Sequence, residues 1–182
     1  MMLREIFKKY NFDIKSNRLG PDCPFTHYKL YFKSSMIKLC QEKFYSFSST
    51  SEFRAGAYAI NCSKISIGEN VIIRPNTMLF ADGREKEGFI TIEKNVMIGS
   101  GVHIYVANHQ YTKNNQDIIN QGHMPAKNTV LKQGCWIGAN AIILPGVHIG
   151  ENTVVGAGSV VTKTLPARVL AAGNPAKIIK KL

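Results

Sequence analysis

Long apolar runs are missing from this sequence. No stretch approaches the roughly 20 apolar residues that a membrane-spanning helix needs. The opening residues MMLREIFKKYNF are interrupted by charges too often for a secretory signal peptide. Cysteine is scarce, and the four cysteines form no CxxC pair, which argues against a zinc site and a disulfide framework. We therefore expect a protein of the reducing cytoplasm, with Cys135 as a small buried residue.

Acidic residues are also few. The chain has 12 Asp and Glu against 23 Lys and Arg, a formal charge of +11, which favours anionic partners in general. Residues 1–54 hold ten of the basic and five of the acidic side chains, so the excess is spread along the chain. Since no basic stripe, finger, zipper or RNA-binding signature occurs, nucleic acid is not an expected partner.

What the sequence does have is a six-residue rhythm. An aliphatic residue recurs at every sixth position through 131–161, and a mostly small or β-branched residue follows each one four places later. The first set is Leu131, Ile137, Ile143, Ile149, Val155 and Val161, and the second is Cys135, Ala141, Val147, Thr153, Ser159 and Leu165. The rhythm also occurs in 67–79 and 92–104, with its phase shifted by the insertion ADGREKEGF.

This period fits neither the 3.6 residues of a helical turn nor the longer repeats of helical solenoids. It predicts short strands joined by corners, in a coil whose turns pair through backbone hydrogen bonds about 4.8 Å apart. We expect Gly138, Gly150 and Gly156 to permit the tight bends at the corners. A β-sandwich with glycine-rich turns would instead favour an alternation of two.

The hexads IGANAI, IGENTV and VGAGSV resemble those of the hexapeptide-repeat acyltransferases. The closing stretch CWIGANAIILPGVHIGENTVVGAGSVVTKTLPARVLAAGNPAKIIKKL is similar to the C-terminal signature of that family almost from end to end, and the resemblance covers residues 55–182. It implies an all-β fold, a left-handed parallel β-helix with three sides of six residues, and a homotrimer with active sites between subunits. The handedness rests on the resemblance alone, because crossovers between parallel strands are ordinarily right-handed.

The two ends of the chain lack the rhythm. Residues 1–48 predict a short helical N-terminal cap, ahead of a β-helix domain over 49–182. Because its helices are basic and amphipathic, peripheral association with the inner membrane face is a further possibility. At the other end, Asn174-Pro175 predicts a helix start, so we expect a C-terminal helix over 174–182. The apolar helical faces in the cap are Leu3, Ile6, Phe7 and Tyr10, and Met36, Ile37, Cys40 and Phe44.

The rhythm stops over residues 107–127, which predicts a protruding loop, and such loops often carry chemistry. His109 lies at its start, and a histidine side chain can accept a hydroxyl proton at neutral pH. A lone loop histidine is ordinarily just solvated. In the family that the hexads resemble, however, a histidine in an Asn-His or Gly-His context before the loop is the catalytic base. The resemblance implies this role for His109, with Asn108 and His123 as acceptor-binding residues.

The other histidines have less specific surroundings. His103 and His148 occupy the last places of their hexads, where we expect structural residues on outer faces, and His27 lies in the cap. The γ-type carbonic anhydrases share the fold and bind zinc through three histidines, two of them closely spaced. Here fourteen residues separate His109 from His123, so we expect no metal.

The resemblance also implies acetyl-CoA as co-substrate. Trp136 matches a tryptophan beside the reactive end of the coenzyme, and the Ala139 N–H matches an oxyanion donor. Without the resemblance, lysines near the chain end would be taken as merely solvated. The remaining matches are Ala157, Thr162 and Lys163 along the coenzyme, and Lys177, Lys180 and Lys181 near its phosphates.

The stretches IRPNTMLFADGREKEG, HIYVANHQY and INQGHMPAKN are most similar to bacterial polysaccharide O-acetyltransferases. This resemblance implies acetyl transfer to a sugar hydroxyl of capsule, lipopolysaccharide O-antigen or a precursor. The acidic acceptor motif of galactoside and maltose acetyltransferases is not found in the N-terminal portion. An N-acyltransferase acting on an amino-sugar nucleotide remains the alternative, and a non-enzymatic or metal-dependent member of the fold is a third reading.

Overall fold

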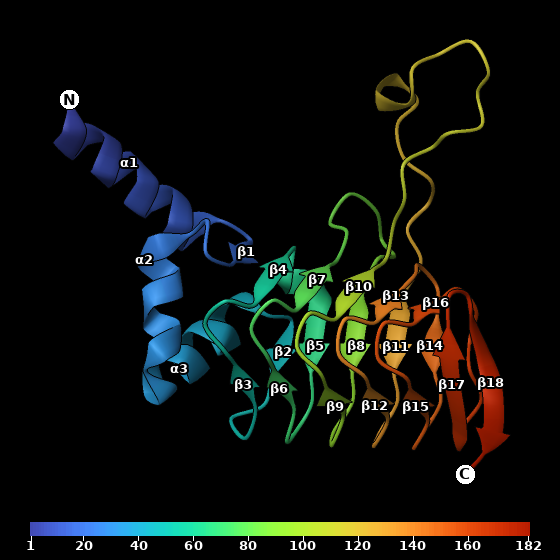
Figure 1. Cartoon of the computed structure of the whole chain (residues 1–182). Coiled ribbons are helices and arrows are strands. Elements are labelled where there is room, and N and C mark those ends of the chain that lie inside the picture. Colours follow the sequence, from blue (N-terminus) through green and yellow to red (C-terminus); the bar gives the residue numbers. More distant parts are fainter.

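The computed structural model describes all 182 residues, and most of them form a coil of short parallel strands (Figure 1). Each turn contributes one strand to each of three faces. The first face holds β4 (Tyr58–Ile60), β7 (Met78–Phe80), β10 (His103–Tyr105), β13 (Ile142–Ile143) and β16 (Val160–Val161). The second holds β2 (Ser46–Phe47), β5 (Ile65–Ile67), β8 (Ile90–Ile92), β11 (Thr129–Leu131) and β14 (His148–Ile149). The third holds β3 (Glu52–Phe53), β6 (Ile72–Ile73), β9 (Met97–Ile98), β12 (Trp136–Ile137), β15 (Val154–Val155) and β17 (Val169–Gly173).

The predicted rhythm fills the interior of this coil. All six aliphatic positions from Leu131 to Val161 are buried, as are the six small or β-branched positions from Cys135 to Leu165. Successive members lie on successive faces, because Leu131, Ile137 and Ile143 belong to β11, β12 and β13. The prediction of parallel strands around one aliphatic core is confirmed.

The expected role of three glycines is wrong. Gly138, Gly150 and Gly156 do not have positive φ, so they do not make the bends. A Cβ atom at Gly138 would instead lie 2.4 Å from the Ala157 nitrogen, and one at Gly150 would lie 2.3 Å from the Ala167 nitrogen. Glycine is needed there because the backbone of the next turn passes so close. The bends fall in a second series with positive φ, at Gly134, Asn140, Gly146, Asn152 and Gly158.

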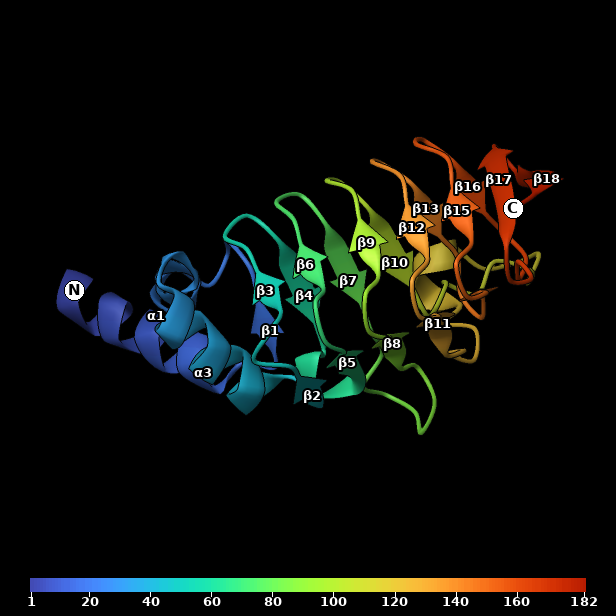
Figure 2. The ribbon, with the colours of Figure 1, turned by 90° about the horizontal axis from the view of Figure 1, so that it is seen from below.

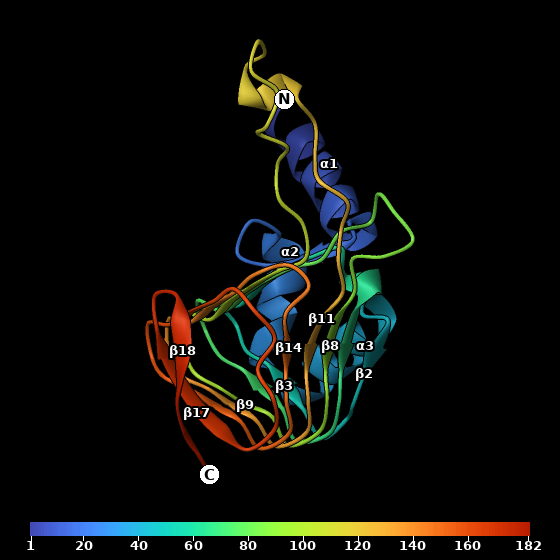
Figure 3. The same cartoon turned by 90° about the vertical axis from the view of Figure 1, so that its right-hand side faces the viewer.

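Segments that interrupt the coil leave it at one corner, between the first and second faces. They are Asn61 with η2 (Cys62–Lys64), the loop 82–88, and the long excursion 107–128, which contains η3 (Ile118–Asn120). We call the last segment the arm. It rises well above the coil beside the shorter loop (Figures 1 and 3). The strands on either side keep their register, since β11 pairs with β8 directly across the interruption.

The N-terminal cap covers the first turn of the coil (Figure 2). It consists of α1 (Met2–Lys15), β1 (Arg18–Leu19), α2 (Pro24–His27), η1 (Tyr28–Tyr31) and α3 (Lys33–Lys43). Helix α3 buries Met36, Leu39 and Cys40, whereas α1 buries only Asp13. The apolar face expected for α1 is uncovered, with Leu3 80% and Phe7 66% exposed. No helix has both the length and the apolar character that crossing a bilayer requires.

The expected C-terminal helix over 174–182 is wrong. Residues Ala176–Lys181 form a strand, β18, which pairs antiparallel with β17 after a turn at Asn174-Pro175. The physical reason is the end of the coil, because β17 has no following turn to pair with and would leave a bare edge. The chain folds back so that β18 pairs with the free backbone groups of this edge. Ile178 and Ile179 are β-branched, which favours a strand.

Candidate functional site

A cleft of about 680 Å³ opens on the first face, at the corner where the arm leaves the coil. We call it the histidine cleft. Its walls come from the ends of β4, β7 and β10, from η2 and the loop 82–88, from the base of the arm, and from Asn17 of the cap. The lining residues are Asn17, Ile60, Asn61, Ser63, Lys64, Phe80, Ala81, Asp82, Gly83, Arg84, Tyr105, Ala107, Asn108, His109 and His123.

The two histidines of the arm face each other in this cleft. The arm base is a short antiparallel ribbon, in which the Met124 N–H donates to the Asn108 carbonyl at 2.9 Å and the Gln110 N–H to the Gly122 carbonyl at 3.0 Å. This pairing sets His109 opposite His123, with ring centroids 4.3 Å apart. The structure therefore brings together Asn108, His109 and His123, although His123 is fourteen residues away in sequence.

The surroundings of His123 favour its neutral imidazole. Desolvation lowers the pKa of His123, and the positive charges of Arg84 and His109 lower it further, against an opposing effect of Asp82. Arg84 is fixed by Asp82, whose carboxylate accepts from Nε at 3.0 and 3.1 Å and from Nη2. The hydrogen bonds from Arg84 hold the pKa of the Asp82 carboxyl below its usual value.

Sequence reasoning did not identify Asp82 and Arg84 as site residues. The available signal was the insertion ADGREKEGF, which shifts the rhythm one turn before the arm does. Since both interruptions leave the coil at the same corner, they meet in space. A second insertion that shifts the six-residue repeat therefore marks a second segment that lines the same cleft.

The floor of the cleft is aromatic. Tyr105 and Phe80 are stacked, with ring centroids 5.0 Å apart and planes 3° from parallel. The Tyr105 hydroxyl lies 3.2 Å from Nδ1 of His103, which is half-buried on β10. His148 is exposed on β14 and His27 ends α2, so neither lines the cleft. No group of three His, Cys, Asp or Glu side chains is placed to hold a metal ion.

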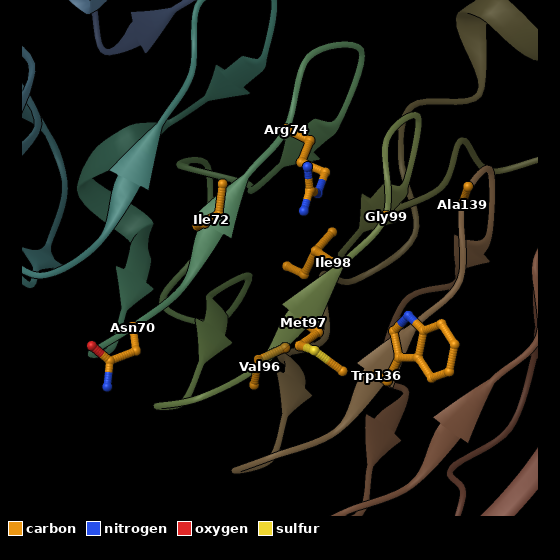
Figure 4. A pocket seen from close by; sticks show the side chains of 9 residues that line it. All are labelled: Asn70, Ile72, Arg74, Val96, Met97, Ile98, Gly99, Trp136 and Ala139. Atoms are coloured by element: carbon orange, nitrogen blue, oxygen red, sulfur yellow. The ribbon is translucent and has the colours of Figure 1, made fainter.

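A second cavity, of about 490 Å³, lies on the third face (Figure 4). The Trp136 indole stands beside Met97 in it, and Ala139 forms one end. Trp136 is 49% exposed and pairs with Met97 across β12 and β9. The exposed Ala139 has an N–H that donates no hydrogen bond within the chain. Ala157 lies next to Ala139, one turn later in the coil. The two turns are joined there by a hydrogen bond of 2.8 Å from the Gly158 N–H to the Ala139 carbonyl.

The remaining predicted coenzyme residues are exposed but more scattered. Thr162 and Lys163 follow β16 at the corner of the first face, and Lys177 and Lys180 lie on β18. The hairpin extends the third face, and its register sets Lys180 in one row with Leu170, Val154 and Trp136. The predicted coenzyme residues thus occupy two faces of the coil.

One chain does not bring His109 and Trp136 together. They line different cavities on different faces, and no residue lines both. Cys135, close to Trp136 in sequence, is fully buried, and burial raises the pKa of its thiol to about 12. Such a thiol is a poor nucleophile.

Comparisons with known proteins agree with this architecture. The family model "Bacterial transferase hexapeptide (six repeats)" matches residues 128–163. A galactoside O-acetyltransferase from Escherichia coli (strain K12) is 32% identical over 129 residues, which are 65% of this chain and 44% of that relative. The chain therefore aligns with less than half the length of this curated relative.

Solved structures match over a larger share of the chain. A galactoside acetyltransferase in complex with coenzyme A superposes with a TM-score of 0.76 at 26% identity, over 97% of this chain and 82% of the other. A hexapeptide-repeat-containing acetyltransferase from Vibrio cholerae O1 biovar eltor, in complex with acetyl coenzyme A, gives 0.72 at 26% identity over 89% and 90%. These neighbours imply the left-handed form of the coil.

The repeat positions that fill the coil, the matched family model and the superposed acetyltransferases lead to the same assignment. Its repeats over residues 128–163 and its fold are those of the hexapeptide-repeat transferases.

Proposed function

We propose that the protein is an acetyl-CoA-dependent O-acetyltransferase that modifies a sugar hydroxyl. The observation that carries this proposal is the histidine cleft, where His109 lies beside Asn108 and His123 above an aromatic floor. Two superposed relatives hold coenzyme A or acetyl coenzyme A, which supports the same coenzyme here. The proposed acceptor is a bacterial surface glycan, capsule or lipopolysaccharide O-antigen, or a precursor of it.

The chemistry is direct transfer. In this proposal His109 accepts the proton of the acceptor hydroxyl, whose oxygen attacks the thioester carbonyl, and the tetrahedral intermediate collapses with release of the coenzyme thiolate. The free N–H of Ala139 is the proposed donor to the oxyanion. Asn108 and His123 orient the acceptor, and a neutral His123 can donate or accept a hydrogen bond there. No covalent intermediate on the protein is needed, consistent with a buried Cys135.

The active site in this proposal forms between copies of the chain. His109 and Trp136 line separate cavities on different faces, so one copy would supply the base and its neighbour the tryptophan. A homotrimer, the assembly implied by the family resemblance, repeats this contact three times around an axis. Trp136, Ala139 and Ala157 would then line the coenzyme groove, with Thr162 and Lys163 further along and Lys177 and Lys180 toward the phosphates.

Turnover of acetyl-CoA tests the proposal. The purified protein is incubated with free sugars, nucleotide sugars and capsule or O-antigen fragments, and released thiol is followed with mass spectrometry of the acceptor. We expect one acetyl on a hydroxyl, with a rate about 10²–10⁴-fold lower in His109→Ala. His148→Ala, exposed on the coil far from the cleft residues in sequence, is the matched control. Acetylation of an amine with His109→Ala nearly as active would favour the N-acyltransferase, and absence of acetyl-CoA binding would refute the proposal.

We also propose a cytoplasmic enzyme that associates with the inner membrane face. The support is the uncovered face of α1, where Leu3 and Phe7 are exposed and Arg4 and Lys8 lie nearby on the helix. Such a helix is suited to an anionic lipid surface. Sedimentation with phosphatidylglycerol vesicles should retain the protein, and Phe7→Ser should reduce the bound fraction. Equal binding to phosphatidylcholine vesicles, or none to either, would argue against it.

A further inference from the structure

The histidine cleft is longer than one sugar needs. Tyr105, Phe80 and Ile60 are register partners on β10, β7 and β4, so they form one row across three turns of the coil. Two strand spacings make this row about 10 Å long. His109 and His123 stand at the Tyr105 end, and the row continues away from them toward the first turn. A single pyranose at His109 would leave most of this floor uncovered.

The far end of the cleft carries amide and hydroxyl side chains. There Asn17 is fixed by Ser63, whose N–H donates to the Asn17 Oδ1 at 2.9 Å and whose hydroxyl accepts from Nδ2 at 2.8 Å. Asn61 lies next to them, held by a 2.8 Å hydrogen bond from its Nδ2 to the Ala81 carbonyl. Amide and hydroxyl groups beside an apolar floor suit a sugar, which presents hydroxyls at its rim and C–H groups on its faces.

Most of the cationic donors in the cleft are already engaged. Arg84 gives its Nε and Nη2 groups to the carboxylate of Asp82, which leaves Nη1 as its free donor group. The Lys64 ammonium donates to the carbonyls of Glu85, Lys86 and Glu87 at 2.8, 2.7 and 3.3 Å, which uses all three of its N–H groups. A diphosphate would need free Lys or Arg donors. The cleft therefore favours a neutral chain of sugars over a nucleotide-linked sugar, despite the net charge of +11.

We infer that the acceptor site is built for at least two linked neutral sugars, with the acetylated unit at His109 and the next unit on the Phe80–Tyr105 pair. This inference rests on the proposed function and narrows its acceptor, a surface glycan or any precursor, to a neutral oligosaccharide or polymer without a nucleotide. The row Tyr105–Phe80–Ile60 supplies apolar contact for the C–H faces of successive rings. The amides at the far end supply hydrogen bonds to the unit beyond.

The test measures acetyl transfer against acceptor length. Methyl α-glucoside, maltose and maltotriose form one series, methyl β-galactoside, galactobiose and galactotriose a second, and UDP-glucose and UDP-galactose a third. We expect kcat/KM for the trisaccharide of the accepted neutral series to exceed that for its methyl glycoside about tenfold. Phe80→Leu and Tyr105→Leu should reduce this ratio severalfold, whereas Tyr45→Leu, an exposed tyrosine outside the cleft, should not.

The outcomes separate the two claims. If methyl glycosides are acetylated as well as trisaccharides, the inference fails and the proposed function stands. Preference for a UDP-sugar, or no transfer to either neutral series while acetyl-CoA still binds, also overturns the inference. If acetyl-CoA does not bind at all, the proposed function fails and the inference fails with it.

Discussion

Ile143 in the coil and Ile119 in the arm have the same side chain in opposite surroundings. Ile143 is fully buried in the shared core, whereas Ile119 is 83% exposed. In the coil each strand is held by strands of the turns before and after it, as β13 is held by β10 and β16. The tip of the arm is held only by its own residues, chiefly through Gln121. The coil is therefore shaped by its neighbouring repeats, and the arm tip by local contacts.

The largest expected effect is on the coil core. Ile143→Ala removes a fully buried side chain and should lower the free energy of unfolding by about 2–5 kcal/mol. Ile119→Ala should change it by less than about 0.5 kcal/mol, because the side chain is exposed. Urea unfolding of both variants measures the difference. Equal losses would mean that the arm tip is buried in the assembled protein and would weaken the comparison.

The next effect separates two kinds of glycine. Gly150→Ala forces a Cβ against the Ala167 backbone and should cost about 1–3 kcal/mol with loss of coil order. Gly122→Ala in the arm meets no atom within 4 Å but has φ +82°, so only the backbone conformation of the arm is strained. We expect Gly122→Ala to leave the thermal midpoint of the coil unchanged. Circular dichroism melts of the two variants check this, and a large fall for Gly122→Ala would contradict it.

A smaller and more local effect is expected at Gln121. Its amide accepts from the Lys113 N–H and donates to the Lys113 and Gln116 carbonyls. Gln121→Ala should open the arm tip, seen as faster hydrogen exchange of the Lys113 amide with unchanged exchange in β10 and β11. Gln133→Ala, an exposed glutamine in the coil, is the control. Faster exchange throughout the coil would show that arm and coil unfold together.

The smallest effect concerns pH at the junction of cap and coil. Burial lowers the pKa of His27, and Asp22 partly offsets this. Nε2 accepts from the Gly56 N–H at 3.3 Å, and the buried Nδ1 has no partner. Because the folded pKa lies below the unfolded value of about 6.5, the unfolded state binds the proton first, and stability falls as pH drops below that value. Melting between pH 7.5 and 5 should show a smaller fall for His27→Gln than for the exposed control His148→Gln.

The coil was predictable from sequence because its rule is local and repeats. The aliphatic residue at every sixth position fills the core. Its burial follows from the repeat and could be predicted without knowing which distant segments it contacts. The bends were assigned to the wrong glycines because the repeat contains two series of them. The bends with positive φ lie at Gly134, Asn140 and Gly146, and not at the glycines that directly follow the aliphatic residues. The C-terminal strand was missed because it depends on an unpaired edge of β17, which local propensity does not reveal.

The candidate site was predictable only in part. His109 stood out because it opens a break in the rhythm, and His123 lies in the same segment. Asp82, Arg84 and the stacked floor of Phe80 and Tyr105 join it only after successive turns are laid side by side. The register of the coil decides which residues of adjacent turns are in contact. Because the insertion shifts the repeat, the sequence alone does not show that these residues are neighbours.

The single corner at which the loop 82–88 and the arm leave the coil has a consequence for how such proteins diversify. Strand β11 pairs with β8 in full register although the whole arm lies between them in the chain, so the length and content of an excursion at this corner are free to vary without disturbing the repeats. Insertions, deletions or transplanted loops at this corner would remodel the walls of the histidine cleft alone. Changes in these two segments can thus reshape the cleft while every other turn is inherited intact.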